Sequence, residues 1–277
     1  MIEVSRLAAP AKLNLFLHVI GRRPDGYHLL QTAFRLIDLC DWITIAPCDD
    51  GAIRLESDLP GVPADENLAL RAARALKNAA GVRAGAAIRI EKRIPVGAGL
   101  GGGSSDAATT LIALNRVWGT GLSRDELATV AVALGADVPF FLLGCNAFGE
   151  GIGEVLAPLD LAPAWYVVLT PQVAVSTAEM FAAPELTRNA KPIKITAFFN
   201  GFGRNDLEPV VCARYPEVAK HLAWLRGFGD ARMSGSGSSV FAEFASAAEA
   251  QAVVARIPEG MRGFAVRGLD RHPLAVW

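Results

Sequence analysis

The chain has 277 residues, of which 52% are hydrophobic and 20% are charged. This balance is typical of a globular protein and excludes a disordered chain, and the length suffices for one large core or two modest ones. The formal net charge of −1 gives no general electrostatic reason to bind nucleic acid or an anionic membrane, so any positive site for phosphate must be local.

The N-terminal residues and the cysteines favour a cytoplasmic protein. Residues 1–6 contain early charges and no long apolar run, so we expect no secretory signal peptide. The four cysteines form no C-x-x-C pair and the four histidines are scattered, so no zinc site is predicted. Free thiols in the reducing cytoplasm are the expected state.

The first predicted element is a strand over residues 7–19, whose side chains alternate strictly after Ala11. One face is aliphatic, and the other carries Lys12 and Asn14. This second face is either solvated, as in an ordinary half-buried strand, or it projects both polar side chains into a cleft.

A tight turn is predicted at residues 21–26, where a Pro-Asp-Gly sequence favours a sharp bend. Tyr27 and His28 follow at its exit. They either pack against the protein or stack on and hydrogen-bond a planar ligand. Further strands are predicted over residues 34–46 and 53–56, and a helix that begins at residues 65–67 ends at Gly81.

Residues 95–105 form a glycine-rich loop between a predicted strand, residues 86–94, and a predicted helix. Glycines let the backbone approach an anion closely, and the first N–H groups of a helix carry partial positive charge. This arrangement predicts a phosphate site. Ser104 or Ser105 can cap the helix, or reach a phosphate or its metal ion.

Two other interpretations of the loop are weaker. A flexible surface loop does not explain the helix start directly after the glycines. Gly97, Gly99 and Gly102 fit the G-x-G-x-x-G pattern of dinucleotide binding, but no suitable acid ends a strand roughly 20 residues later. A P-loop is excluded, because the chain contains no Gly-Lys dipeptide.

The apolar stretch over residues 127–144 predicts a buried helix, a tight turn and a second apolar segment, not a membrane span. A capping box formed by Ser123 and Glu126 starts the helix. Asp137 lies between the apolar segments, so its carboxylate needs a cationic partner or hydrogen-bond donors. It is either a cap or structural ion pair, or a functional acid.

The second half begins near Leu156, after which residues 158–164 read as a proline-rich turn. This second half is predicted to alternate between strands and helices, with a mobile loop at residues 189–204 and a second glycine-serine loop at residues 233–239. The predicted strands are 165–170, 240–244 and 264–267, and the predicted helices begin at Ser176, at residues 205–209, at Pro216 and at residue 246.

Phosphoryl transfer explains three separated motifs together. The glycine loop and helix end hold a triphosphate, and Mg²⁺ neutralises its charge. Asp137 accepts the proton of the attacking hydroxyl, and Lys12 supports the carboxylate and the transferring group.

At this point the chain resembles the GHMP small-molecule kinases. Residues 9–14, 95–105 and 234–237 look like the first, second and third motifs of that family. Residues 24–28 and 135–141 resemble members whose substrate is a methylerythritol linked to cytidine diphosphate. The resemblance covers essentially the whole chain in the same order, so it is far more specific than any single motif.

The resemblance implies an α+β fold of two domains, residues 1–156 and 157–277, with ATP and substrate in the cleft between them. It implies ATP-dependent phosphorylation of the 2-hydroxyl of the methylerythritol in the non-mevalonate isoprenoid pathway, with Mg²⁺. The expected partner is this small molecule, without nucleic acid or membrane, and the expected state is a monomer or weak homodimer.

The resemblance also assigns roles to residues. Asp137 is the implied base, with Lys12 beside it, and His28 reads the cytosine edge while Tyr27 and Phe181 stack on the ring. The implied ATP-binding residues are Pro95, Val96, Gly97, Ala98, Gly99, Leu100, Gly101, Gly102, Gly103, Ser104 and Ser105, with Asn67 and Lys92 near the adenosine. The implied substrate-binding residues are Asn14, Tyr27, His28, Asp137, Phe181, Gly235, Ser236 and Gly237.

Other classes remain open on the residues alone. Mevalonate and homoserine kinases share the glycine loop but have no use for a cytosine clamp. A nucleotide-binding protein without catalysis does not need Lys12 and Asp137, and a dehydrogenase would bind NAD instead of ATP.

Overall fold

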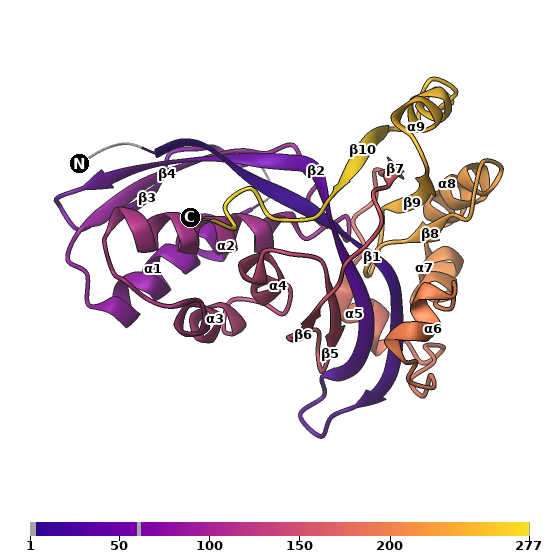
Figure 1. Cartoon of the computed structure of the whole chain (residues 1–277), viewed down its shortest axis with the longest axis horizontal. Coiled ribbons are helices and arrows are strands. Elements are labelled where there is room, and N and C mark those ends of the chain that lie inside the picture. Colours follow the sequence, from indigo (N-terminus) through magenta and orange to yellow (C-terminus); the bar gives the residue numbers. More distant parts are fainter. Residues whose placement is uncertain (1–3, 60–61, 277) are drawn as a thin grey trace.

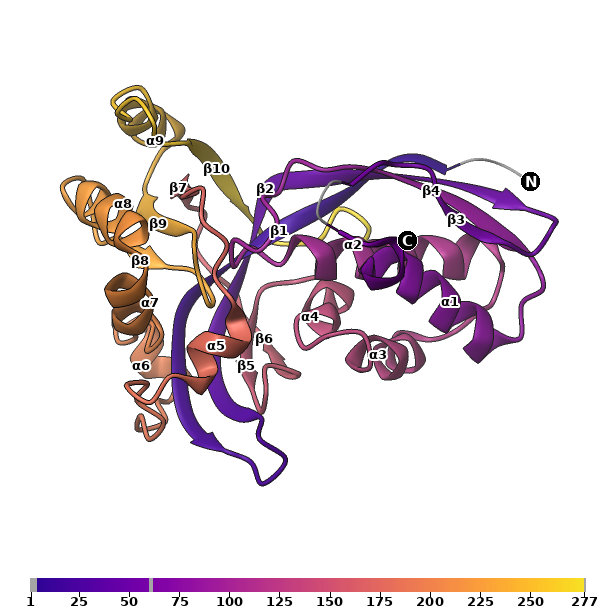
Figure 2. The same cartoon turned by 180° about the vertical axis from the view of Figure 1, so that it is seen from behind.

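A computed structural model describes residues 4–59 and 62–276 of the chain. Residues 1–3, on which the expectation of no signal peptide partly rests, lie outside these ranges. The fold mixes helices with one large sheet, which confirms the predicted α+β class. Two groups of helices lie on either side of a long central hairpin (Figures 1 and 2).

The hairpin consists of β1 (Val4–Arg22) and β2 (His28–Cys48), which pair antiparallel along most of their length. Its register places Lys12 opposite Leu36 and Asn14 opposite Phe34. The main path of the sheet runs β3-β4-β2-β10-β7-β9-β8, and β5 and β6 extend from β2. These strands are β3 (Ile53–Leu55), β4 (Gly85–Glu91), β5 (Ala147–Glu150), β6 (Val155–Pro158), β7 (Trp165–Leu169), β8 (Arg232–Met233), β9 (Val240–Phe244) and β10 (Gly263–Leu269).

The helices divide between the two ends of the sheet (Figure 1). The first group covers the part built from β1 to β4 and comprises the 3-10 turn η1 (Ala64–Glu66), α1 (Leu68–Ala80), α2 (Gly102–Val117), α3 (Arg124–Val132) and α4 (Val138–Leu143). The second group comprises α5 (Thr177–Ala182), α6 (Ile195–Phe199), α7 (Glu208–Arg214), α8 (Pro216–Arg226) and α9 (Ala247–Val254).

Local signals set most of the helix ends as predicted. Ser123 and Glu126 form the capping box of α3, and the Ser176 hydroxyl accepts the Glu179 N–H at the start of α5. Gly81 ends α1 in the left-handed conformation. The stretch over residues 127–144 is divided into α3 and α4, and no helix within the described ranges is long and apolar enough to cross a membrane.

Two expectations about local structure are wrong. α2 begins at Gly102 with Gly101 as its N-cap, so Ser104 and Ser105 lie inside the first turn and cap nothing. The glycines tolerate a helix start one turn earlier than the serines suggest. The segment over residues 189–204 contains α6, and the Gln31 side chain anchors it by accepting the Ile193 N–H at 2.8 Å and donating to the Ile193 carbonyl at 3.3 Å.

The buried apolar residues form three clusters. One fills the space between the first helices and the sheet, one lies under α5 to α9, and one lies along the middle of the hairpin. The hairpin reaches the second cluster through Leu17. The C-terminal segment reaches the first cluster through Leu274. The yellow C-terminal segment runs back beside α2 (Figure 1). The division at residues 156 and 157 stays a prediction.

Candidate active site

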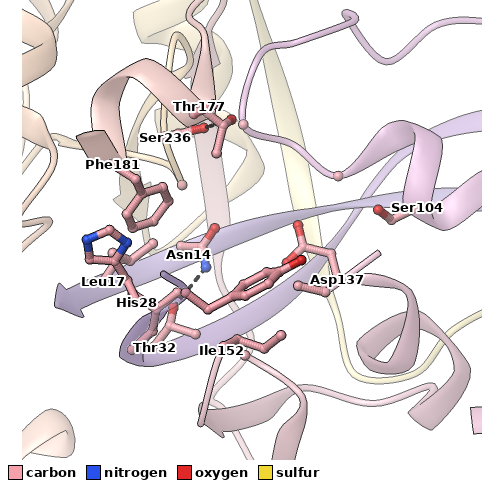
Figure 3. Close-up of a pocket in the computed structure, with 18 of the residues that line it drawn as sticks. Asn14, Leu17, His28, Thr32, Ser104, Asp137, Ile152, Thr177, Phe181 and Ser236 are labelled. Atoms are coloured by element: carbon pink, nitrogen blue, oxygen red, sulfur yellow. Dashed lines mark hydrogen bonds between the residues drawn. The ribbon is translucent and has the colours of Figure 1, made fainter. Parts of the chain in front are cut away.

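A cleft of about 670 Å³ opens between the two groups of helices and gathers residues from distant parts of the sequence (Figure 3). It is lined by the predicted residues Lys12, Asn14, Tyr27, His28, Gly97, Gly99, Gly101, Ser104, Asp137, Phe181, Gly235 and Ser236. The remaining predicted residues lie behind this lining or away from it: Asn67, Lys92, Pro95, Val96, Ala98, Leu100, Gly102, Gly103, Ser105 and Gly237.

Lys12 and Asp137 form an ion pair at the floor of the cleft. The Lys12 ammonium is buried and lies 3.2 Å from Asp137 Oδ2, whereas the Asp137 side chain keeps 32% of its exposure. Asp137 immediately precedes α4, yet its side chain makes no capping hydrogen bond. The carboxylate is therefore free of a structural cap and faces the space where a ligand would lie.

Asn14 is held in one orientation beside this pair. Its Nδ2 donates to Thr32 Oγ1 at 2.8 Å, and the Thr32 hydroxyl donates in turn to the Phe16 carbonyl. Asn14 Oδ1 therefore faces Lys12 and accepts a hydrogen bond from its ammonium. Of the two alternatives for the polar face of β1, the structure supports the cleft, because both side chains are only 3% exposed and line it.

The glycine loop reaches the cleft through backbone that only glycine adopts easily. Gly97, Gly99 and Gly101 have φ angles of 68°, 74° and 72°. A Cβ on Gly99 would lie 2.3 Å from the carbonyl oxygen of Ser234. The loop leads directly into α2, whose first N–H groups have no partner within the helix and can bind an anion.

The second glycine-serine loop closes against the first. The buried Ser234 hydroxyl donates to the Gly99 carbonyl at 3.1 Å and accepts the Asn14 N–H at 3.1 Å. The hydroxyls of Ser236 and Thr177 lie 2.6 Å apart (Figure 3). Ser234, Thr32 and Thr177 belong to the site, although only the motif over residues 234–237 indicated any of them beforehand.

His28 and Phe181 meet at the far end of the cleft (Figure 3). Their rings stack with centroids 5.0 Å apart and planes inclined by 30°. Tyr27 is 60% exposed beside them. The predicted sandwich of a base between Tyr27 and Phe181 stays a prediction.

Arg188 contacts this end of the site, although no sequence motif singled it out. Its Nε donates to His28 Nε2 at 3.1 Å. Burial lowers the pKa of His28 below its ordinary value, and the Arg188 and Arg22 guanidinium groups lower it further.

Lys92 and Asn67 have structural partners. The Lys92 ammonium bridges Asp41 and Asp106, lying 2.8 Å from Asp106 Oδ2. Burial raises the pKa of Asp106 to about 7 despite Lys92, and the Asp41 carboxylate adds to the rise. Asn67 is the N-cap of α1 and accepts the Ala69 N–H at 3.0 Å. A contact of Lys92 and Asn67 with adenosine stays a prediction.

Residues 4–59 and 62–276 contain no group of three or more His, Cys, Asp or Glu side chains that could hold a metal ion alone. The Ser104 hydroxyl lines the cleft at the first turn of α2. Ser105 Oγ is buried without a hydrogen-bond partner among the described residues. All four cysteines are free thiols, as predicted.

Known proteins resemble the chain along its whole length. The sequence family described as GHMP kinases N terminal domain matches residues 67–145, and GHMP kinases C terminal matches residues 182–263. A relative from Nitrosospira multiformis named 4-diphosphocytidyl-2-C-methyl-D-erythritol kinase is 59% identical over 269 residues, which are 96% of this chain and 92% of the relative. A relative of the same name from Aromatoleum aromaticum is 57% identical over 278 residues, which are 99% of this chain and 98% of the relative.

Solved structures show the same likeness. A crystal structure of 4-(cytidine 5'-diphospho)-2C-methyl-D-erythritol kinase superposes with a TM-score of 0.83 and 37% identity, covering 96% of this chain and 99% of that one. A homoserine kinase from Cytophaga hutchinsonii has a TM-score of 0.73 at 17% identity, covering 98% of this chain and 95% of its own, and shares the fold.

Proposed function

The chain belongs to the GHMP kinase family, and we infer that it phosphorylates the 2-hydroxyl of 4-diphosphocytidyl-2-C-methyl-D-erythritol with ATP. The reaction is a step of the non-mevalonate isoprenoid pathway. The relatives that carry this name match more than nine-tenths of the chain at 57–59% identity. The observation that carries the chemistry is the Lys12–Asp137 ion pair in the cleft beside the glycine loop.

The transfer needs a base, a phosphate site and compensation for charge. The substrate hydroxyl oxygen attacks the γ-phosphorus of ATP, the bond to the β,γ-bridging oxygen breaks, and ADP leaves. We assign the released hydroxyl proton to the Asp137 carboxylate, whose side chain is 32% exposed and lines the cleft. The Lys12 ammonium stabilises negative charge at the transferring group, and Asn14 orients the erythritol.

The glycine loop supplies the triphosphate site. Positive φ angles at Gly97, Gly99 and Gly101 expose backbone N–H groups, and the N-terminus of α2 adds partial positive charge. Mg²⁺ bound to a nucleotide keeps several waters and needs only one or two protein ligands. The Ser104 hydroxyl, which lines the cleft at the first turn of α2, would supply one such ligand beside the phosphates, and Asp106 is already paired with Lys92. When bound, the ion neutralises phosphate charge.

The far end of the cleft is assigned to the cytosine. His28 and Phe181 provide a polar edge and an aromatic face there, with Tyr27 at the rim. The loop at Gly235, Ser236 and Gly237 is assigned to the substrate diphosphate. A cytoplasmic location agrees with the free thiols, and the net charge of −1 offers nothing to nucleic acid or anionic membrane. We keep a monomer or weak homodimer as the expected state.

ADP release by the purified protein tests the function. Mg-ATP is supplied with 4-diphosphocytidyl-2-C-methyl-D-erythritol, mevalonate or homoserine in parallel. Turnover with the cytidylated substrate alone is the expected result. Turnover with mevalonate or homoserine would still support a kinase but would overturn the proposed substrate. ATP binding without turnover on any of the three would overturn the roles of Lys12 and Asp137.

A further inference from the structure

We propose that Arg188 is a positioning residue that fixes the tautomer of His28 and so makes the cleft select cytosine over uracil. The proposal rests on the proposed function, because it takes a cytidylated substrate as the ligand. It concerns a residue that lies outside the cleft lining and touches His28 from behind.

Arg188 is itself held rigidly by the end of α5. Its Nη2 donates to the carbonyl oxygens of Phe181 at 2.9 Å and Ala183 at 2.6 Å, and its Nη1 donates to the Leu186 carbonyl at 3.1 Å. A guanidinium has five donors in one plane, so these three bonds fix where its Nε–H points. That Nε–H donates to His28 Nε2.

This contact determines where the imidazole carries its proton. Arginine has no acceptor atom and stays protonated, so His28 Nε2 must present a lone pair. The neutral ring then carries its hydrogen on Nδ1. The Arg188 and Arg22 charges act in the same direction, because they lower the pKa of His28 and disfavour the doubly protonated ring. No described residue occupies Nδ1 with a hydrogen bond, so its N–H remains available to a ligand.

A fixed Nδ1–H donor distinguishes the two pyrimidines. The edge of cytosine has an acceptor at N3, whereas uracil has an N–H donor at the same position. A donor facing a donor leaves two polar groups unpaired, and a site built for one hydrogen-bond pattern rejects the other strongly. Without Arg188, His28 could present either a donor or a lone pair, and it would gain a proton more readily.

The test compares wild type with Arg188→Met, which removes the guanidinium, and with Arg188→Lys, which keeps a charge without the fork. Arg214→Met is the matched control, since Arg214 pairs with Glu185 in the neighbouring segment and lies outside the cleft. Each protein is assayed with 4-diphosphocytidyl-2-C-methyl-D-erythritol and with its uridine counterpart. Nitrogen-15 NMR of the His28 ring follows the tautomer between pH 6 and pH 8.

For wild type we expect a protonated Nδ1 and an unprotonated Nε2 across this pH range. Arg188→Met should raise KM for the cytidylated substrate about tenfold with a much smaller change in kcat, and should reduce the cytosine-to-uracil preference in kcat/KM by about tenfold. Arg188→Lys should restore little of it, and Arg214→Met none of these changes. If Arg188 had only a structural role, Arg188→Met would lower kcat/KM equally for both substrates and leave the cytosine-to-uracil preference unchanged.

Two results would overturn the proposal. One is a wild-type spectrum with the proton on Nε2, which needs no variant and no turnover. The other is an unchanged base preference in a folded Arg188→Met protein. Failure of the proposed function would look different, because wild type would then not turn over the cytidylated substrate while the His28 tautomer could still be read.

Discussion

The Lys12 ammonium lies 3.2 Å from the Asp137 carboxylate and connects β1 to the residue that precedes α4. The ion pair holds the positive charge and the proposed base at fixed positions relative to each other. Such preorganisation avoids reorganising charged groups during the reaction, which is the largest contribution in many enzymes.

Removing either member of this pair should abolish most turnover while leaving the fold intact. We expect Asp137→Asn to lower kcat by about 10²- to 10⁴-fold, since it removes general-base assistance. Lys12→Met should lower kcat by at least about 100-fold, because a charge facing the transferring group is lost. Steady-state ADP release measures both, and nucleotide binding by calorimetry should persist.

Asp230→Asn serves as the control, since that exposed carboxylate pairs with Arg232 and lies outside the cleft lining. If Asp137→Asn kept wild-type kcat, the carboxylate would not be the proton acceptor.

Two glycines of the phosphate loop should differ in their tolerance of a methyl group. Gly97 and Gly99 share nearly the same positive φ, but a Cβ on Gly97 meets nothing within 4 Å. Gly97→Ala should therefore lower the unfolding free energy by only about 1–2 kcal/mol, which is the cost of holding an alanine in the left-handed conformation. Gly99→Ala should cost at least about 2 kcal/mol more, because its Cβ would strike the Ser234 carbonyl. Urea unfolding of the two variants measures the difference, and equal costs would mean that the two loops do not pack closely.

The buried Lys92 should matter for stability. Lys92→Met leaves Asp41 and Asp106 without their cation, and we expect a loss of about 3–5 kcal/mol in unfolding free energy at pH 8. Asp106→Asn keeps the shape and an acceptor for Lys92, so at acidic pH, where the Asp106 carboxyl is protonated, it should stay within about 1 kcal/mol of wild type.

The pH dependence of the Asp106 contribution follows from its raised pKa. Because the folded pKa, about 7, exceeds the unfolded value of 3.8, the folded state binds more protons between these limits. This contribution to stability is therefore present at acidic pH and is lost as the pH rises through 7. Subtracting the Asp106→Asn curve from the wild-type curve of unfolding free energy should show that decline, and a rising difference would contradict it.

His272 should make the fold sensitive to acid. Burial lowers its pKa from 6.5 to about 4, and the Arg124 charge adds to the effect. Between these two pH values the ring is therefore neutral in the folded state and protonated in the unfolded chain. The ring also accepts the Leu274 N–H at 3.0 Å through Nδ1, which protonation would break. Stability should fall as the pH drops below 6.5, by on the order of 2–3 kcal/mol at pH 4.5.

Comparison with His272→Gln isolates this effect from the other acid-sensitive groups. The variant should lose less unfolding free energy than wild type between pH 7 and pH 4.5, as measured by urea unfolding at both values. Identical losses would show that the pKa of His272 does not differ between the folded and unfolded states.

Local sequence signals were sufficient for many elements of this protein. The capping box at Ser123, the cap at Ser176 and the terminal Gly81 act within a few residues of the helices they delimit, so they can be recognised in one dimension. The alternation along β1 and the motifs at residues 95–105 and 234–237 likewise identified the family. The start of α2 was misplaced, because glycines at a helix N-terminus give no signal that distinguishes loop from helix.

The tertiary structure decided which of these residues meet. The structure leaves Asp137 without a capping hydrogen bond and pairs it with Lys12 of β1, a partner that the local sequence does not reveal, while its role as the base stays a proposal. Lys92 was predicted near adenosine, but Asp41 and Asp106 hold it from two other elements. Arg188 carried no motif, and its role appears only where the end of α5 folds against His28. Sequence patterns report local backbone preference and burial, whereas the chemistry of a charged group depends on neighbours that only the folded chain brings within a few ångströms.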